Sequence, residues 1–531
     1  MPTLTVALDD GDRRFPFVPG PSLRDLLDEV GVPVRSGCRG TGACGLCLVR
    51  IEAGAIGDPT FTERFHLDDA HLTQNARLAC QVRPEHDLRV TILAPAPRSV
   101  WRRLNAREQR RVRYVGPPLD PSSPVAKPYG VAVDLGTTHI RLSLHDLASG
   151  RWLAGRQGLN PQMSVGSDVI ARLVAAAESS EQARAASQQV VAAIGDALWD
   201  IAVREGINLQ QVARLTLVGN TAMLALLAGR NANLLLQPSH WTRAIDCRPD
   251  GTAAWAVAWG IHPAATIEVI APLAGFVGSD LLAGVVATRL MENGVGALLI
   301  DFGTNSEIAL WDGQTLWVTS AAGGPAFEGC GVRCGLPAEP GAIHRVTRRD
   351  DGGWAFAVIA GEEPRGLCGS GLVDLIAGLV GSGELTRLGR FASSVPDAGW
   401  TLARGERDIV LTKRDVDLLQ RAKAAIGVGV QVLLAQAGLK VEDLQRLYVS
   451  GAFGESLDVA NAQAIGLLPG IAPERVELCG NTALAGCEDA LFSPEVGERL
   501  QRLADRARIV NLSHCADFDT LFFENLYLEP L

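Results

Sequence analysis

Residues 130–146 read GVAVDLGTTHIRLSLHD, and the pattern returns at residues 297–313 as ALLIDFGTNSEIALWDG. Each copy predicts an apolar strand, a tight glycine turn and a second strand with alternating polarity. The first strand ends in an aspartate, Asp134 or Asp301, and the turn offers N–H and hydroxyl groups that can hold phosphate. The repeat therefore predicts two phosphate-binding hairpins. Their aspartates would face each other across a cleft and hold hydrated Mg²⁺, which takes few direct protein ligands.

One such turn is weak evidence for a nucleotide site, whereas two copies between apolar strands are much stronger. The arrangement resembles the superfamily of acetate and sugar kinases, heat-shock chaperones and actin, in which two ribonuclease-H-like lobes close on ATP. The stretch VSGAFG at residues 449–454 is similar to that superfamily's adenosine motif. The nucleotide-binding residues implied are Asp134, Gly136, Thr137, Thr138, Asp301, Gly303, Thr304, Asn305, Gly451, Ala452, Phe453 and Gly454. An α/β domain with glycine turns and no nucleotide remains the alternative.

Three carboxylates are candidates for catalysis: Asp134, Asp301 and Glu307. The two aspartates would hold the magnesium nucleotide, and Glu307 would orient the attacking water. A strand residue that merely faces solvent is an equally good interpretation of Glu307.

The N-terminal region carries a cysteine-rich loop, SGCRGTGACGLC, at residues 36–47. Strands at 3–7 and 14–18 and a helix over 22–31, with Ser22 as its N-cap and Gly31 as its stop, are expected before the loop. Four thiolates are what a [2Fe-2S] cluster requires. The candidate ligands are Cys38, Cys44, Cys47 and Cys80. A zinc site is the weaker alternative, because a second Cys-x2-Cys pair is missing.

The segment 1–94 resembles the plant- and adrenodoxin-type [2Fe-2S] ferredoxins, which implies a β-grasp domain with one cluster. Five residues separate Cys38 from Cys44, as in the adrenodoxin-like branch. This spacing leaves the ligand assignment unchanged.

The chain changes character after the ferredoxin-like segment. Residues 95–128 are rich in arginine and then in proline, and predict a short basic helix followed by a semi-rigid spacer. The first lobe is expected over 129–296 and the second over 297–531. The predicted fold class is therefore multidomain, with an α+β domain followed by two α/β lobes.

Charge and hydropathy limit the function classes. The net charge of −10 argues against a general nucleic-acid binder. The most apolar long window, residues 255–278, contains prolines and charged or polar residues, so we expect buried core rather than a membrane span. The first residues do not have the pattern of a secretory signal. A cytoplasmic protein without a membrane or nucleic-acid partner is the expectation.

A more specific resemblance covers nearly the whole chain. The motifs VDLGTT, VGNTAM, DFGTNSEIAL, SAAGGPAFEG, CGSGLVDLI, AKAAIGVG, SGAFG, IGLLPG and GNTALAGC are together similar to the reductive activators of corrinoid proteins. That resemblance implies ATP-dependent reduction of cob(II)amide to cob(I)amide on a corrinoid protein of a methyltransferase system. It also implies an upstream electron donor, a reductase or ferredoxin, and suggests a homodimer.

Other functions stay open at this point. They are a small-molecule kinase with a fused redox domain, an electron carrier whose ATPase-like region only docks a partner, and an activator of radical dehydratases. Cys330 and Cys334 are expected to be packing or loop thiols rather than a second metal site, and His344 is expected to be structural.

Overall fold

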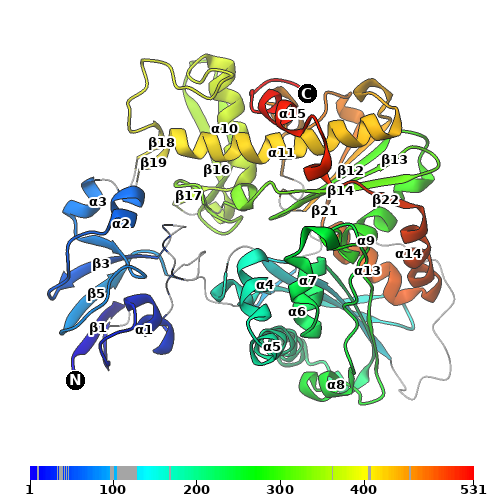
Figure 1. The fold of residues 1–531 in the computed structure, drawn as a ribbon, viewed down its shortest axis with the longest axis horizontal. Helices are drawn as coiled ribbons and strands as arrows, with labels where there is room; N and C mark the ends of the chain where they lie inside the picture. Colours follow the sequence, from blue (N-terminus) through cyan, green and yellow to red (C-terminus); the bar gives the residue numbers. More distant parts are fainter. Residues whose placement is uncertain are drawn as a thin grey trace. The chain divides into compact units, whose positions relative to one another are not determined.

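The computed structural model describes residues 1–8, 11–32, 34, 40, 42, 45, 47–67, 69–95, 101–104, 128–166, 169–329, 331–361, 363–404, 408–451, 453 and 456–531. These residues form two compact units (Figure 1). The first combines residues 1–100 with 159–182, and the second combines 101–158 with 183–531. Since residues 159–182 belong to the first unit, the compact units do not follow the expected limits at 94, 128 and 296, which stay predictions.

A five-stranded sheet in the order β2-β1-β5-β3-β4 forms the centre of the first unit. The elements are β1 Thr3–Leu8, β2 Gly11–Pro16, α1 Leu23–Glu29, β3 Leu48–Ala53, α2 Phe61–His66, α3 Asp69–Thr73, β4 Ala76–Leu78, β5 Leu88–Ile92, η1 Pro161–Ser164 and α4 Val169–Ala177. Leu4 and Val6 alternate toward the core, where Leu88 and Val90 of the parallel neighbour join them. The mixed sheet covered by helices fits the predicted ferredoxin-like domain.

Two local predictions can be compared with this unit. Ser22 is confirmed as the N-cap of α1, because its side chain accepts a hydrogen bond from the Asp25 N–H. Gly31 follows the helix with a φ of +71°, the conformation that ends helices. The second strand begins at Gly11 rather than at residue 14, since Leu8 pairs with Gly11 and only two residues connect the strands.

The second unit contains two six-stranded sheets that share the order of five strands and differ in the sixth: β6 is antiparallel to β9, whereas β22 is parallel to β14. Their orders are β11-β10-β7-β8-β9-β6 and β21-β20-β12-β13-β14-β22. The strands are β6 Arg102–Arg103, β7 Tyr129–Leu135, β8 His139–Asp146, β9 Trp152–Leu159, β10 Val212–Gly219, β11 Thr266–Val269, β12 Ala297–Phe302, β13 Ser306–Trp311, β14 Leu316–Ala321, β20 Arg446–Gly451, β21 Val476–Gly480 and β22 Ala507–Ile509. The internal repeat seen in two hairpins therefore extends to whole sheets, which we call the first lobe and the second lobe.

Helices cover both sheets (Figure 1). They are α5 Ser180–Glu205, α6 Thr221–Ala228, α7 Ala232–Leu235, α8 Ala253–Trp259, α9 Ser279–Ala287, α10 Gly369–Ser382, α11 Lys413–Ala437, α12 Val459–Ala464, α13 Thr482–Phe492, α14 Pro494–Arg506 and α15 Phe518–Asn525. Short 3-10 segments are η2 Leu209–Gln211, η3 Pro238–His240, η4 Leu290–Glu292, η5 Pro325–Glu328, η6 Ile359–Gly361, η7 Val441–Asp443, η8 Pro473–Arg475 and η9 Leu512–His514. Small sheets are formed by β15 Ala342–Arg348, β16 Trp354–Val358 and β17 Gly366–Leu367, and by β18 Trp400–Ala403 and β19 Ile409–Leu411.

Two helices connect the lobes. Helix α9 follows β11 of the first lobe and contacts β10 of that lobe as well as β12 and β13 of the second, whereas α13 follows β21 of the second lobe and contacts β7 and β10 of the first. The two helices also pack on each other. The starts of α9 and α13 are thereby brought to the two hairpin aspartates.

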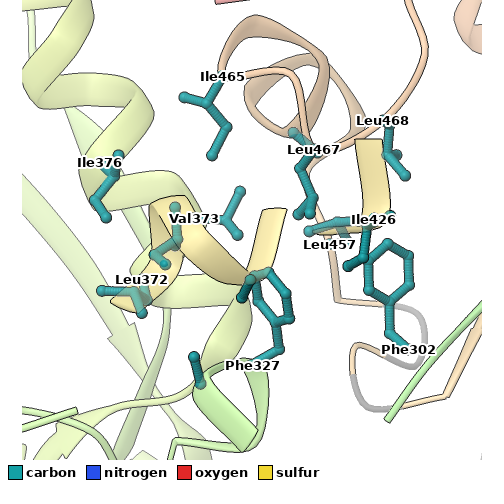
Figure 2. Close-up of a cluster of buried hydrophobic side chains, with 14 of the residues drawn as sticks. Phe302, Phe327, Leu372, Val373, Ile376, Ile426, Leu457, Ile465, Leu467 and Leu468 are labelled. Carbon is teal, nitrogen blue, oxygen red and sulfur yellow. The ribbon is translucent and has the colours of Figure 1, made fainter. Parts of the chain in front are cut away.

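The core of the second lobe lies between its sheet and helices α10 and α11. Figure 2 shows Phe302 of β12 and Phe327 of η5 beside Val373 of α10 and Ile426 of α11, all of them buried. Among the described residues, α11 is the one helix with the length and composition of a membrane span, and 78% of its apolar window is buried inside the protein. It is the central core helix of this lobe.

Part of the arginine-rich connection differs from its prediction. Arg102 and Arg103 form strand β6, paired with β9, where a basic helix was expected. A short isolated helix is only marginally stable because its first turn is costly to form, whereas β9 offers hydrogen-bond partners at the edge of the sheet. Residues 105–127 lie outside the described part of the chain.

Candidate functional site

The first hairpin joins β7 and β8 at a turn that requires glycine. The Gly136 N–H donates to the His139 carbonyl over 3.1 Å. A Cβ at Gly136 would lie 2.6 Å from that oxygen. The register places Asp134 opposite Arg141, so a carboxylate and a guanidinium flank the turn that carries Thr137 and Thr138.

The second hairpin repeats this geometry with different charge. A Cβ at Gly303 would lie 3.0 Å from the Asn305 carbonyl oxygen. Asp301 stands opposite Glu307 in the register of β12 and β13. The position held by an arginine in the first hairpin is thus held by a glutamate in the second.

The structure brings the two hairpins together. The hydroxyl oxygens of Thr138 and Thr304 are 3.3 Å apart. Both hydroxyls donate to one carboxylate oxygen of Glu328, over 2.9 Å and 3.0 Å. Sequence reasoning missed Glu328, because nothing in the spacing of SAAGGPAFEG connects it with a turn 190 residues earlier.

Four carboxylates gather behind the turns: Asp134, Asp280, Asp301 and Glu307. Burial, together with the charges of Asp301 and Asp134, raises the pKa of Asp280 to about 8. Burial chiefly raises the pKa of Asp301 to about 6, and the Asp134 charge adds to the effect against a hydrogen bond from Ser450. The pKa of Glu307 is also raised, by burial and by Asp280 and Asp301. Carboxylates whose pKa values are raised by burial and by one another are typical of functional sites.

Within the described residues, no group of three or more His, Cys, Asp or Glu side chains is arranged to hold a metal ion directly. Magnesium usually keeps several waters and binds through one or two carboxylates and substrate phosphates. The acidic cluster and the threonine hydroxyls therefore fit a hydrated Mg²⁺ that arrives with a nucleotide.

Asp134 is held by a residue that sequence reasoning also missed. The Asn481 side chain donates to the Asp134 carboxylate over 2.6 Å and caps helix α13 by accepting from Leu484. The Arg141 guanidinium lies 3.7 Å from the same carboxylate. Burial still raises the pKa of Asp134 above its usual value. The repeated tetrapeptide GNTA, at 219–222 and 480–483, was the signal available for Asn481.

Asp280 is the counterpart of Asn481 in the repeated architecture. It lies in the first turn of α9, as Asn481 lies at the start of α13. Its interaction with Asp301 is a repulsion between carboxylates, whereas Asn481 donates a hydrogen bond to Asp134. The sequence offered GSD at a helix start, which by itself is not distinctive.

Glu307 is a buried member of this cluster. Its side chain is 7% exposed and accepts a hydrogen bond from the Ser320 hydroxyl over 3.3 Å. The alternative of a strand residue facing solvent is therefore wrong. Its role in orienting water stays a prediction.

The glycine-rich turn after β20 packs directly on the second hairpin. Gly451 has a φ of +90°, and a Cβ there would lie 2.1 Å from the Phe302 carbonyl oxygen and 2.5 Å from a carboxylate oxygen of Asp301. Phe453 is buried, and its ring lies 4.9 Å from that of Phe302 and 5.3 Å from that of Phe327. Any nucleotide contact in this motif would involve the backbone. Ala452 and Gly454 lie outside the described residues.

Two of the four proposed cluster ligands are described, and both are buried at one end of the first sheet. The Ala79 N–H donates to the Cys47 carbonyl over 2.8 Å, which sets Cys47 beside the strand end that leads to Cys80. A Cβ at Gly40 would lie 3.8 Å from the Cys80 Cβ, so the glycine loop reaches this cysteine. The Gln81 amide donates to the Cys80 sulfur over 3.4 Å. These features fit a [2Fe-2S] cluster, while Cys38 and Cys44 lie outside the described residues.

The remaining cysteine and histidine predictions have simple outcomes. Cys334 is buried, and burial raises the pKa of its thiol well above the usual value. The backbone carbonyl of His344 accepts a hydrogen bond from Ser370, and the role of its side chain stays a prediction. Cys330 lies outside the described residues.

Comparison with known proteins covers the chain in three consecutive segments. Residues 6–85 match the 2Fe-2S iron-sulfur cluster binding domain, residues 129–293 the RACo middle region, and residues 296–530 the C-terminal domain of RACo, the ASKHA domain. The last two segments together span about three quarters of the chain.

Relatives over most of the length are corrinoid-activating proteins. The chain is 34% identical over 400 residues to "Corrinoid activation enzyme RamQ" of Eubacterium limosum, covering 71% of the chain and 66% of RamQ. It is 27% identical over 434 residues to "[Co(II) methylated amine-specific corrinoid protein] reductase" of Methanosarcina barkeri, covering 75% of the chain and 76% of the relative. The match thus spans just under two thirds of the length of RamQ.

A solved structure shares the fold of the entire chain. It is "Reductive activator for corrinoid,iron-sulfur protein", with a TM-score of 0.69, 24% identity, and coverage of 100% of this chain and 99% of that one. The predicted class, a ferredoxin-like domain followed by lobes of the sugar kinase and actin type, is confirmed.

Proposed function

The chain belongs to the family of reductive activators of corrinoid proteins, and from this premise we propose its reaction. It transfers one electron from an N-terminal [2Fe-2S] cluster to the cob(II)amide of a corrinoid protein, giving cob(I)amide for a methyltransferase system. ATP hydrolysis to ADP and phosphate accompanies the transfer. The observation that carries the proposal is the meeting of two phosphate-type hairpins over a buried acidic cluster, in a chain that also matches a 2Fe-2S domain.

The electron source is the first unit. A [2Fe-2S] cluster held by Cys38, Cys44, Cys47 and Cys80 supplies one electron per reduction. Cys47 and Cys80 are buried in the described part of this unit, and Gln81 donates a hydrogen bond to the Cys80 sulfur. These residues exclude water from the sulfur atoms and help set the reduction potential. A separate reductase or ferredoxin supplies the next electron to the oxidised protein.

The nucleotide site is in the second unit. Thr138 and Thr304 lie close enough for their hydroxyls to bind the same phosphate chain. Arg141, beside Asp134, is a fixed cation that can stabilise negative charge on the phosphates. Mg²⁺ would be held through water by the acidic cluster, and Glu307 is buried where it can accept a proton or orient a water molecule.

ATP is needed because cob(I)amide is a very strong reductant, so a ferredoxin-type cluster alone would transfer its electron uphill. A protein that binds the cob(II) form tightly can change the surroundings of the cobalt and ease its reduction. Nucleotide turnover then switches the lobes and releases the product, provided that ATP and ADP states differ in affinity for the partner.

We further propose that the protein is cytoplasmic and that it forms a homodimer. The domain limits 1–94, 95–128, 129–296 and 297–531 and the nucleotide residues named from the sequence belong to the same proposal. No nucleic-acid or membrane partner is part of it.

ATPase stimulation tests the proposal against a small-molecule kinase. We expect hydrolysis to rise on addition of a corrinoid protein in its cob(II)amide form and to be unaffected by glycerol or sugars. An EPR signal of a reduced [2Fe-2S] type in the same preparation separates it from radical dehydratase activators, which hold a [4Fe-4S] cluster. Stimulation by a sugar alone would overturn the proposal.

A further inference from the structure

Glu328 occupies the place where the two hairpins offer their hydroxyl donors. One of its carboxylate oxygens accepts from Thr138 over 2.9 Å and from Thr304 over 3.0 Å. Those threonines come from different lobes and different sheets. This carboxylate therefore accepts hydrogen bonds from the same two hydroxyls that the proposed function assigns to phosphate oxygens.

The backbone around Glu328 keeps it in this position. It ends the short helix η5, and its neighbour Phe327 is buried against Phe302 of the second hairpin, with ring centroids 5.9 Å apart. A Cβ at Gly369, the first residue of α10, would lie 2.1 Å from the Phe327 carbonyl oxygen. Glu328 is thus anchored to a packed core rather than placed on an independent loop.

The charge of this carboxylate conflicts with phosphate binding. Asp134 and Asp301 lie on the strands of the same two hairpins, and burial raises the pKa of both carboxyls. A nucleoside triphosphate without a metal ion would bring several more negative charges toward Glu328. Repulsion between unit charges at contact distance costs about 1 kcal/mol in water and more in a partly buried site.

We propose that Glu328 makes the site selective for the magnesium complex of a nucleoside triphosphate over the metal-free nucleotide and free phosphate. A divalent cation that accompanies the phosphates neutralises the carboxylate. The threonine hydroxyls can then donate their hydrogen bonds to the phosphates instead of to Glu328. Without the cation, the carboxylate continues to accept the hydrogen bonds of both threonine hydroxyls and repels the metal-free nucleotide. This inference rests on the proposed nucleotide site and adds a specificity residue to it.

Isothermal titration of ATP into the full-length protein tests the inference, with excess magnesium and with excess EDTA. The variant E328Q keeps the shape and an acceptor oxygen but loses the charge. E339Q is the matched control, because Glu339 lies in the segment that follows and pairs with Arg365 instead of a hairpin. If E328Q does not fold, which its melting temperature will show, E328A gives the same test.

We expect E328Q to bind metal-free ATP about tenfold more tightly than the wild type. The affinity ratio between the two buffers should shrink by a similar factor, and E339Q should keep the wild-type ratio. An unchanged ratio in E328Q would overturn the inference, as would an equal loss of affinity in both buffers. A wild-type protein that binds ATP in neither buffer would instead refute the proposed nucleotide site.

Discussion

Replacing Gly451 by alanine probes the contact between the glycine-rich turn and the second hairpin. The new Cβ would lie 2.1 Å from the Phe302 carbonyl oxygen and 2.5 Å from a carboxylate oxygen of Asp301. The nearest of these atoms is a backbone oxygen of β12, which cannot rotate away as a side-chain end can. The hairpin must therefore move, and Asp301 with it.

Two costs add at this position. The positive φ of +90° costs an L-residue roughly 1–2 kcal/mol. Relief of the overlap costs about 1–3 kcal/mol more, the usual range for an overpacked core site. G438A isolates the first cost, because Gly438 has a φ of +66° but a Cβ there would meet no atom within 4 Å.

Thermal unfolding and ATP titration are the two assays. We expect G451A to melt below G438A and to bind magnesium ATP at least about tenfold more weakly than the wild type, the effect of about 1.4 kcal/mol on binding. Visible absorption of the cluster should be the same in all three proteins. A G451A protein with the melting temperature of G438A and normal ATP affinity would show that this turn does not position Asp301.

Three further predictions follow from the site. The pKa values of Asp301 and Asp280 are about 6 and 8 in the folded protein, against 3.8 for an ordinary aspartate. Between about pH 4 and these values the folded protein holds protons that the unfolded chain has released. Without nucleotide, the protein should therefore lose stability as pH rises from about 4 to 8. Melting temperatures across that range should show the decline, and D280N should flatten it; a wild-type slope in D280N would contradict the assignment. N481A removes both a helix cap and the hydrogen bond to Asp134, whereas N220A removes only the equivalent cap of α6. In urea unfolding, N481A should therefore lose about 1 kcal/mol more stability than N220A. Equal losses in the two variants would count against the Asp134 contact. Q81L removes the amide donor to the Cys80 sulfur and should lower the midpoint potential of the cluster by roughly 20–60 mV, the equivalent of one hydrogen bond. Q74L is the control for this potentiometric titration, and an unchanged potential in Q81L would contradict the role of Gln81.

The sequence indicated the parts of the site that are local. Asp134 and Asp301 each stand at the end of an apolar strand before a glycine turn, so short-range pattern was enough to find both hairpins and their threonines. The cysteine spacing likewise indicated the cluster loop, and the resemblance of nearly every motif placed the chain in its family.

Contacts between distant segments could not be predicted in this way. Glu328, Asn481 and Asp280 reach the hairpins only because the lobes pack on each other, with α9 contacting strands of both sheets and α13 contacting the sheet of the first lobe. No periodicity in the sequence reports such pairings. The environment of Glu307 was open for the same reason, since the sequence of β13 does not show that both faces of this strand are buried.

Reduction of a corrinoid protein under limiting electron supply tests the central claim most directly. The reduced full-length protein is mixed with a cob(II)amide corrinoid protein, and the cob(I)amide absorption is followed with and without magnesium ATP, for the wild type and for D301N. The proposed function predicts that cob(I)amide accumulates with ATP in the wild type only, while D301N still folds and keeps its cluster. Equal accumulation without ATP, or in D301N, would contradict an ATP-dependent activator.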